Sequence, residues 1–344
     1  MQKLLSVAIP CFNSEDYVEK AIKSLLPGEG QVEIIVVDDG STDGTAEIAS
    51  EYKNKYPDTV RVITKENGGH GDAVMAATKA AGGLYFRVLD SDDWLDGAAL
   101  TQLLKILEEM RDPEKAADLV ISNYVYEKVS EGRSHPINYR KTIPSGRLFG
   151  WDEVGKWSLG SYILMHAATY RTEIVHKSEM QLPKHTFYVD HLYVCRLMMH
   201  VKKMYYLDAD LYHYFIGRAD QSVNEKVMLS RIDQQLRVNR LMLYELDADS
   251  VEDRGKREYL YYYTEIVTLA TVSFLLRRNT KEDEKVMEDF LDEIEEKRPV
   301  YYAWIMGRPF YRHMMGPIRR LPHWFGYPLY RICYIIARRI FGFN

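Results

Sequence analysis

Gly83-Leu84-Tyr85-Phe86-Arg87-Val88-Leu89-Asp90-Ser91-Asp92-Asp93-Trp94 is the stretch around which the rest of the chain is organised. Its first half is a short apolar run next to a Gly-Gly pair, a pattern that predicts a buried strand. It ends in three closely spaced carboxylates, Asp90, Asp92 and Asp93, at the end where open α/β sheets bind ligands. Oxygen ligands of this kind suit Mg²⁺ or Mn²⁺. The alternative is an acidic turn in which Asp93 or Asp96 caps the next helix.

Similar apolar runs occur upstream, at residues 4–9, 33–37 and 60–63, and each is followed by a polar loop and an amphipathic pattern. This alternation predicts a mainly parallel sheet with helices on both sides. Asp39, after the second run, could accept hydrogen bonds from a base or sugar, or could cap a helix.

A glycine-rich loop at residues 65–72 could bring backbone N–H groups close to a phosphate. It has neither the P-loop spacing nor the GxGxxG fingerprint. A kinase, an ATPase and a dinucleotide dehydrogenase are therefore disfavoured.

Length and composition allow one large domain with an appendage, because the chain has 344 residues. A net charge of −5 gives no general case for nucleic-acid binding, and three scattered cysteines indicate a reducing compartment. We expect neither a signal peptide nor a membrane-spanning run. The expected protein is intracellular and soluble, or held at a membrane surface.

Four motifs, taken in order and spacing, resemble those of family 2 glycosyltransferases, which are inverting, nucleotide-sugar-dependent enzymes with the GT-A fold. The motifs are Ile9-Pro10-Cys11-Phe12-Asn13, Val37-Asp38-Asp39-Gly40-Ser41-Thr42-Asp43-Gly44-Thr45, Glu66-Asn67-Gly68-Gly69 and Leu89-Asp90-Ser91-Asp92-Asp93. The resemblance implies a Rossmann-like catalytic domain at residues 1–220, with a nucleotide-sugar-binding half at 1–125 and an acceptor-binding half at 126–220. A helical region would follow at residues 221–344.

The resemblance also implies roles for single residues in the donor site. Pro10 and Phe12 would line the nucleotide pocket, Asp39 would read the uracil, and Asn67 would lie near the base. The DxD element at the ribose and diphosphate would be formed by Asp90, Ser91 and Asp92.

The same resemblance implies a Mn²⁺ or Mg²⁺ cofactor, with Asp92 and Asp93 as its ligands. His213 could complete this metal site, although a core strand explains His213 almost as well. Arg218 could face the diphosphate.

The segment after Asn67-Gly68-Gly69 departs from the family pattern. Many relatives continue with Ala-Arg-Asn, whereas this chain has His70-Gly71-Asp72-Ala73-Val74. The missing arginine puts the usual phosphate contact in doubt, and the pattern looks closer to relatives that glycosylate polyprenyl phosphate.

Asp190 is the expected catalytic base. Inverting transfer needs a group that removes the acceptor proton, and a carboxylate within hydrogen-bond reach is suitable. In the family an Asp in a Glu-Asp or similar pair, which opens a helix after an aromatic residue, has this role. Asp190 in Phe187-Tyr188-Val189-Asp190 matches that position, with Val189 where Glu is common. The alternative is a helix-start Asp stabilised by the helix dipole. His135 and His166 receive no role.

The tail, residues 304–344, has seven arginines, no lysine and no acid, interleaved with aromatic residues. This composition favours either a surface that lies in a membrane interface or an arginine-rich helix packed on the acidic helices before it.

The resemblance thus implies a metal-dependent hexosyl- or N-acetylhexosaminyltransferase that uses a UDP-sugar and a glycan or lipid-linked acceptor of the cell envelope. It would be cytoplasmic, at the inner face of the plasma membrane, and would bind no nucleic acid. The absent Gln-x-x-Arg-Trp motif favours addition of one or a few sugars. The alternatives are a polyprenyl-phosphate glycosyltransferase and a non-catalytic sugar-nucleotide-binding scaffold.

Overall fold

The computed structural model describes residues 2–158, 160–217, 221, 225–278, 280–308 and 328. The chain divides into two compact units. The sheet unit comprises residues 1–156 and 163–221, and the helical unit comprises residues 157–162 and 222–344.

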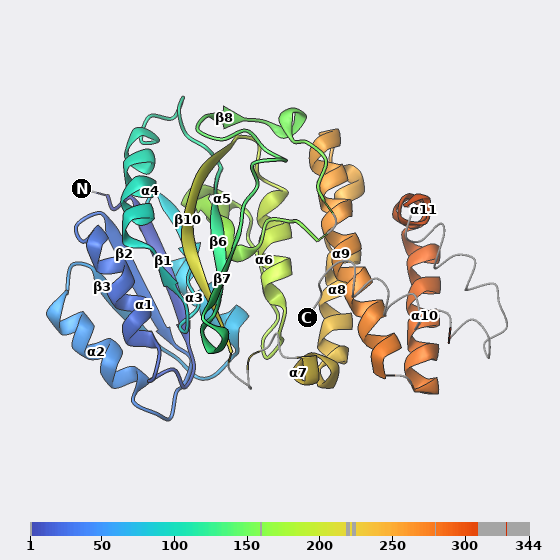
Figure 1. The fold of residues 1–344 in the computed structure, drawn as a ribbon, viewed down its shortest axis with the longest axis horizontal. Coiled ribbons are helices and arrows are strands. Elements are labelled where there is room, and N and C mark those ends of the chain that lie inside the picture. The colour runs from blue at the N-terminus through green and yellow to red at the C-terminus, as the bar shows by residue number, and fades with distance from the viewer. Residues whose placement is uncertain are drawn as a thin grey trace. The chain divides into compact units, whose positions relative to one another are not determined.

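A ten-stranded mixed sheet forms the centre of the described part of the sheet unit (Figure 1). Its main path runs β3-β2-β1-β4-β9-β6-β10-β5, with β7 paired to β6 and β8 paired to β10. The longest ladders, β1 with β2 and β6 with β10, are parallel. The strands are β1 (Leu5–Cys11), β2 (Val32–Asp38), β3 (Val60–Thr64), β4 (Tyr85–Val88), β5 (Trp94–Leu95), β6 (Leu119–Lys128), β7 (Arg133–Ile137), β8 (Leu148–Phe149), β9 (Ala168–Arg171) and β10 (Met204–Ile216).

Helices cover both faces of this sheet, as the alternating pattern predicts. Helices α1 (Val18–Leu25), α2 (Thr45–Lys55) and α4 (Gly97–Glu109) lie on one side, where α1 contacts both α2 and α4. Helices α3 (His70–Ala80), α5 (Thr172–Lys177) and α6 (Val189–Met198) lie on the other, where α3 contacts both α5 and α6. The expected mainly parallel sheet flanked by helices is therefore confirmed.

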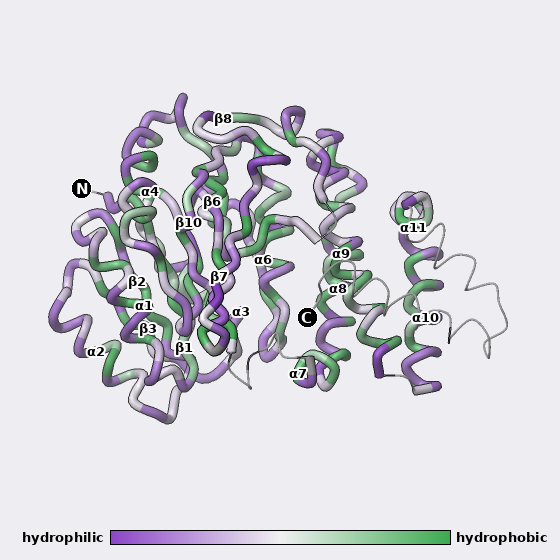
Figure 2. Tube along the Cα trace, in the orientation of Figure 1, coloured by the Kyte–Doolittle hydropathy of each residue, from purple (hydrophilic) through white to green (hydrophobic). Residues whose placement is uncertain are grey.

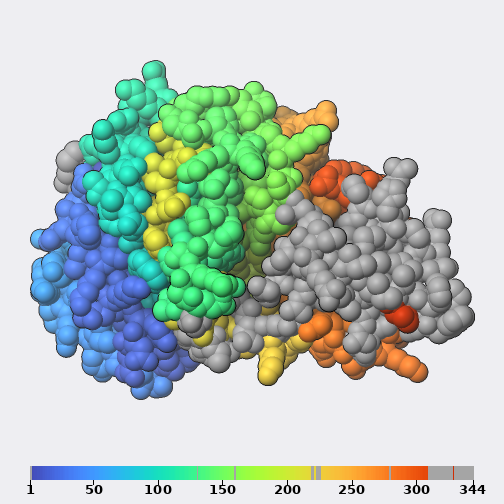
Figure 3. Space-filling model, viewed as in Figure 1, coloured from blue at the N-terminus to red at the C-terminus, as the bar shows by residue number. Residues whose placement is uncertain are grey.

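The apolar runs form strands because both faces of the sheet are covered and can bury them. All seven residues of β1 are buried. Figure 2 shows the hydrophobic segments along the strands. By contrast, the segment around the exposed strand β7, drawn in green in Figure 3, lies on the surface of this unit.

Asp96, rather than Asp93, caps the helix that follows the acidic stretch. The Asp96 side chain accepts a hydrogen bond from the Ala99 N–H at 2.8 Å, and α4 begins at the next residue, Gly97. The capping alternative therefore explains one acid of this region and leaves Asp90, Asp92 and Asp93 for another role.

The helical unit contains α7 (Glu225–Ser230), α8 (Ile232–Tyr244), α9 (Arg254–Arg278), α10 (Lys281–Lys297) and α11 (Pro299–Gly307). Within it, Trp157 and Tyr162 pack against Tyr259 and Tyr263 of α9, with ring centroids 5.0 Å apart in each pair. None of the helices in the described ranges is both long and apolar enough to cross a membrane. Most of the tail lies outside the described residues, so its expected membrane contact stays a prediction.

Candidate active site

The motif residues meet at the carboxyl edge of the sheet, where β1, β2 and β4 run parallel and end together. Pro10 lies within β1 opposite Val37, and Phe12 follows β1 with 52% of its surface exposed. Asp39 comes directly after β2, and Asp90 follows β4. Three segments separated in sequence thus place their motif residues at one edge.

Asp39 holds the glycine-rich loop in place. Its Oδ1 accepts hydrogen bonds from the Gly68 N–H at 3.0 Å and from Lys65 Nζ at 2.5 Å, and its Oδ2 accepts one from the Gly69 N–H at 2.7 Å. The Asn67 amide donates to the Asp39 backbone oxygen at 3.0 Å. Because helix α2 begins only at Thr45, with Gly44 at its N-cap, Asp39 is not a helix cap. The two residues expected near the base therefore lie together.

The glycine-rich loop also touches the segment that leads to Asp190. The His185 N–H donates to the Gly68 carbonyl at 2.7 Å. Gly69 has φ +85°, and a Cβ on it would lie 3.1 Å from the His185 nitrogen. Glycine is therefore favoured at this approach, because the positive φ strains other residues and a Cβ would press on the His185 backbone.

Two histidines hold the carboxylate of Asp90. His70 Nε2 lies 2.9 Å from Oδ1, and His166 Nε2 lies 3.3 Å from Oδ2. Burial raises the pKa of Asp90, but the hydrogen bonds from His166 and His70 outweigh it and keep the pKa below its ordinary value. For His70, burial lowers the pKa, whereas the hydrogen bond and charge of Asp90 raise it, with a net rise. Asp90 is thus an oriented carboxylate.

Asp93 is fully buried and connects the acidic stretch to β10. Its Oδ2 accepts a hydrogen bond from the Tyr212 hydroxyl at 2.5 Å, and its Oδ1 accepts one from the Phe215 N–H at 2.8 Å. The same Tyr212 oxygen accepts from the Asp90 N–H at 3.2 Å. Burial and the charges of Asp92 and Asp90 raise the pKa of Asp93 well above its ordinary value. A cation would relieve this repulsion.

The neighbouring Ser91 and Asp92 have partners from other segments. The Ser91 hydroxyl lies 2.8 Å from the Ser14 hydroxyl, at the start of the loop after β1. The Gln221 amide lies 3.4 Å from Asp92 Oδ2. The whole DxD element is therefore held by residues far from it in sequence.

A metal ion fits this edge. Asp90, Asp93 and His166 each offer one ligand atom, and these atoms lie within 4.8 Å of one another. Carboxylate oxygens and imidazole nitrogens are suitable ligands for Mn²⁺. Of the expected ligands, Asp93 belongs to this group and Asp92 is its close neighbour in sequence. His213 instead lies with its Nδ1 2.8 Å from Glu127 Oε1 and its ring stacked on Trp94.

Asp190 lies in the first turn of α6, after Tyr188, which has a left-handed conformation with φ 65°. Its side chain is 28% exposed, and its Oδ2 is 3.9 Å from His191 Nδ1. The charges of Asp90, Asp190 and Asp39 all raise the pKa of His70. Three acids assigned to donor binding and catalysis therefore act on one histidine. Arg218 lies outside the described residues.

His166 receives no role from the sequence, yet its Nε2 lies 3.3 Å from Asp90 Oδ2. This residue lies in a short 3₁₀ helix, η4 (Met165–Ala167), which precedes β9. No motif surrounds it, and only the pairing of β9 between β4 and β6 brings it to Asp90. His70 did carry a signal, because it follows Asn67-Gly68-Gly69 directly.

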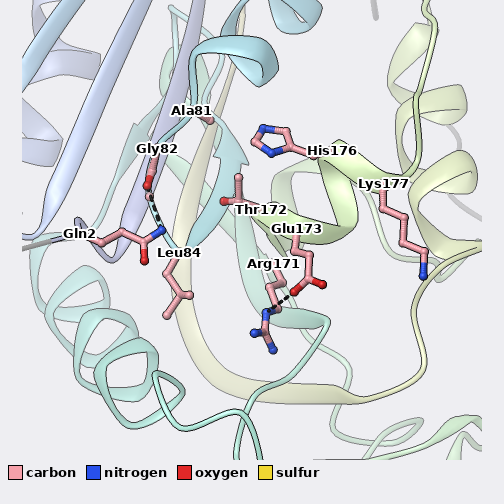
Figure 4. Close-up of a pocket in the computed structure, with 10 residues that line it drawn as sticks. Gln2, Ala81, Gly82, Leu84, Arg171, Thr172, Glu173, His176 and Lys177 are labelled. Atoms are coloured by element: carbon pink, nitrogen blue, oxygen red, sulfur yellow. Dashed lines mark hydrogen bonds and ion pairs between the residues drawn. The ribbon is translucent and has the colours of Figure 1, made fainter.

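A separate pocket of about 700 Å³ lies at the opposite end of β4, around residues 81–84 and 171–177 (Figure 4). In it, Arg171 pairs with Glu173 at 3.4 Å, and the Gln2 amide donates to the Gly82 carbonyl at 3.1 Å. None of the expected site residues lines it.

Comparisons with known proteins point to a glycosyltransferase family. Residues 6–165 match the model of Glycosyl transferase family 2. The chain is 26% identical to the "Putative glycosyltransferase EpsH" of Bacillus subtilis (strain 168) over 271 residues, which cover 74% of this chain and 71% of that protein. It is 25% identical to the poly(ribitol-phosphate) beta-N-acetylglucosaminyltransferase TarS of Staphylococcus aureus (strain Mu50 / ATCC 700699), over 74% of this chain and 42% of TarS.

Solved structures share the fold. The crystal structure of S. aureus TarS 1–349 in complex with UDP-GlcNAc has a TM-score of 0.65 at 22% identity, and covers 85% of this chain and 81% of that chain. The mannosyltransferase PcManGT from Pyrobaculum calidifontis in complex with GDP-Man and Mn²⁺ has a TM-score of 0.53 at 13% identity, over 88% and 83% of the two chains. Four motifs at one sheet edge and a family model matched over residues 6–165 identify this part of the chain as a glycosyl transferase family 2 domain.

Proposed function

We propose that this glycosyltransferase moves a sugar from a UDP-sugar to a hydroxyl group of a cell-envelope glycan or lipid-linked acceptor, with inversion at the anomeric carbon and dependence on a divalent metal ion. The observation that carries the proposal is geometric: Asp39 accepts hydrogen bonds from the Gly68 and Gly69 N–H groups, and the next residue, His70, lies with Nε2 2.9 Å from Asp90 Oδ1. The segment that leads to Asp190 contacts the same loop through the His185 N–H. A base-reading residue, a diphosphate element and a catalytic base are the three parts that such a transfer needs.

A UDP-sugar is the proposed donor. TarS, which shares the fold, has been crystallised with UDP-GlcNAc. Here Asp39 and Asn67 form the polar end of the proposed nucleotide pocket, and the exposed ring of Phe12 supplies an apolar surface beside it. N-acetylglucosamine is accordingly the first sugar to test.

The proposed mechanism uses the residues at the sheet edge in two roles. Asp90, Asp92 and Asp93 would hold a Mn²⁺ or Mg²⁺ ion at the donor diphosphate, and this cation would offset the negative charge of the departing UDP. Asp190 accepts the proton of the acceptor hydroxyl while that oxygen attacks the anomeric carbon from the face opposite the leaving group. The C–O bond to UDP breaks as the new glycosidic bond forms, which inverts the configuration.

Two other functions differ from this one in ways that can be measured. A polyprenyl-phosphate glycosyltransferase would use a lipid phosphate as acceptor, and the His70-Gly71 pattern favours it. A scaffold that only binds sugar nucleotides would bind UDP without releasing it from a sugar donor.

The direct test is UDP release from UDP-GlcNAc, UDP-glucose and UDP-galactose by the purified full chain, with Mn²⁺ or with EDTA. Poly(ribitol phosphate) and a polyprenyl phosphate are added separately as acceptors. We expect one donor to release UDP faster with an acceptor and with Mn²⁺, and the product to have the inverted anomeric configuration by NMR. Binding of UDP without any release would instead favour the scaffold.

We also propose that the tail brings the enzyme to a membrane surface. Each arginine near an anionic surface contributes on the order of 1 kcal/mol, and aromatic residues favour the interface. The full chain should sediment with vesicles that contain anionic lipid at low salt and be released as salt rises. Failure to bind at low salt would favour the packed-helix alternative.

A further inference from the structure

Arg87 is a charged side chain in the middle of the hydrophobic core. It lies in β4, three residues before Asp90, and no part of it is exposed. Within the described part of the chain, its guanidinium forms no ion pair, and its Nε has no hydrogen-bond partner. Burial lowers the pKa of Arg87 only to about 10, so it is charged at neutral pH. A buried charge without an acidic partner destabilises a fold, so stability does not explain this residue.

The contacts of Arg87 lead to the acidic stretch. Its Nη2 donates to the His166 carbonyl at 2.7 Å, and its Nη1 donates to Thr169 Oγ1 at 3.4 Å. The guanidinium also lies 5.7 Å from the centre of the Tyr212 ring. The first contact fixes the backbone of the residue whose imidazole reaches Asp90, and the third contact is with the residue whose hydroxyl joins Asp90 to Asp93.

The ring of His166 has little freedom of its own. It stacks on Tyr214 at 4.6 Å with an angle of 21°, and lies 4.7 Å from the Tyr212 ring. Its Nε2 is 3.3 Å from Asp90 Oδ2. Since the two tyrosine rings fix its plane, the backbone position set by Arg87 decides how far the imidazole extends toward Asp90.

We propose that Arg87 is a positioning residue of the donor site, which holds the His166 backbone and through it the carboxylate of Asp90. A methionine would fill the same volume without the cost of a buried charge, but it could not donate to the His166 carbonyl. The inference rests on the proposed function, because Asp90 is taken as part of the donor-diphosphate element.

The test compares Arg87→Met and Arg87→Lys with wild type in thermal unfolding, in binding of Mn²⁺-UDP by calorimetry and in kcat/KM for UDP release. We expect Arg87→Met to unfold at or above the wild-type temperature, yet to lose at least tenfold in Mn²⁺-UDP affinity or in kcat/KM. Arg87→Lys keeps one donor and should recover part of that loss. Arg171→Met, a charge loss in β9 at the separate pocket of Figure 4, is the matched control and should leave Mn²⁺-UDP affinity and kcat/KM unchanged.

A double-substitution cycle separates positioning from general packing. If Arg87 acts through His166, Arg87→Met should have almost no further effect on Mn²⁺-UDP affinity in a His166→Ala background. Fully additive losses, or an Arg87→Met variant with wild-type affinity and kcat/KM, would overturn the proposal. Should Arg87→Met not fold, Arg87→Lys is compared in the same two backgrounds. A wild-type protein that binds Mn²⁺-UDP but never releases UDP from a donor refutes the proposed function, while the affinity cycle still decides the role of Arg87.

Discussion

Replacement of Asp190 by asparagine separates the two roles open to this residue. The side chain lies in the first turn of α6 and is 28% exposed, so its charge can stabilise the helix as well as accept a proton. Asparagine has nearly the same size but cannot serve as a general base at neutral pH. The fold should therefore tolerate the change.

The two roles differ in magnitude. A partly exposed carboxylate at a helix start contributes about 0.3–1 kcal/mol through the dipole, which corresponds to a fall in unfolding temperature of at most roughly 2–4 °C. Loss of a general base lowers the rate by about 10²- to 10⁴-fold, or about 3–5 kcal/mol of activation free energy. The rate loss thus exceeds anything that the helix contribution could cause.

The assay is acceptor-dependent UDP release, together with UDP binding in Mn²⁺ and thermal unfolding. We expect kcat for Asp190→Asn to fall at least 100-fold, with UDP affinity unchanged. Glu173→Gln removes a charge from the first turn of α5 and is the matched control, with no expected effect on rate. Near-normal transfer by Asp190→Asn would refute the reasoning and leave Asp190 as a helix-start residue only.

Four further substitutions, with one control, test the site and the helical unit. Asp92→Ala and Asp93→Ala should each abolish metal-dependent transfer. Only Asp93→Ala should also lower the unfolding temperature, because the buried Tyr212 hydroxyl and the partly buried Phe215 N–H lose their acceptor, at about 1–3 kcal/mol for a buried donor. Equal stability of the two variants would contradict this. Gly69→Ala should lower the free energy of unfolding by about 1–3 kcal/mol and weaken UDP binding, since a Cβ there would lie 3.1 Å from a backbone nitrogen. Gly132→Ala, at a position with open space around it, is the control and should leave UDP binding intact. Burial raises the pKa of Glu265 to about 7 from its ordinary 4.5, so between these pH values the native helical unit binds more protons than the unfolded chain. Its free energy of unfolding should therefore fall by up to roughly 3 kcal/mol as pH rises through this range. Glu265→Gln should flatten this pH dependence in urea unfolding, and an unchanged slope would contradict the assignment.

The sequence by itself determined the layered fold and the edge that holds the site. Apolar runs of four to seven residues form strands wherever both sheet faces are covered, and the intervening amphipathic patterns form the helices. Because parallel strands end at one edge, Asp39 and the acidic stretch after β4 had to meet there. These outcomes depend on local hydrophobic patterns and on the rule that parallel strands end at one edge of the sheet, so they can be predicted from the sequence alone.

Only the tertiary structure decided which side chains complete the site. Asp93 is held by Tyr212, 119 residues away, because β5, which begins at the residue after Asp93, pairs antiparallel with β10. His166 reaches Asp90 because β9 inserts between β4 and β6, and Arg87 meets its carbonyl there. Such contacts depend on which strands pair and in what register. A single sequence does not encode that choice in any local pattern, because it is the burial of the whole sheet that selects it.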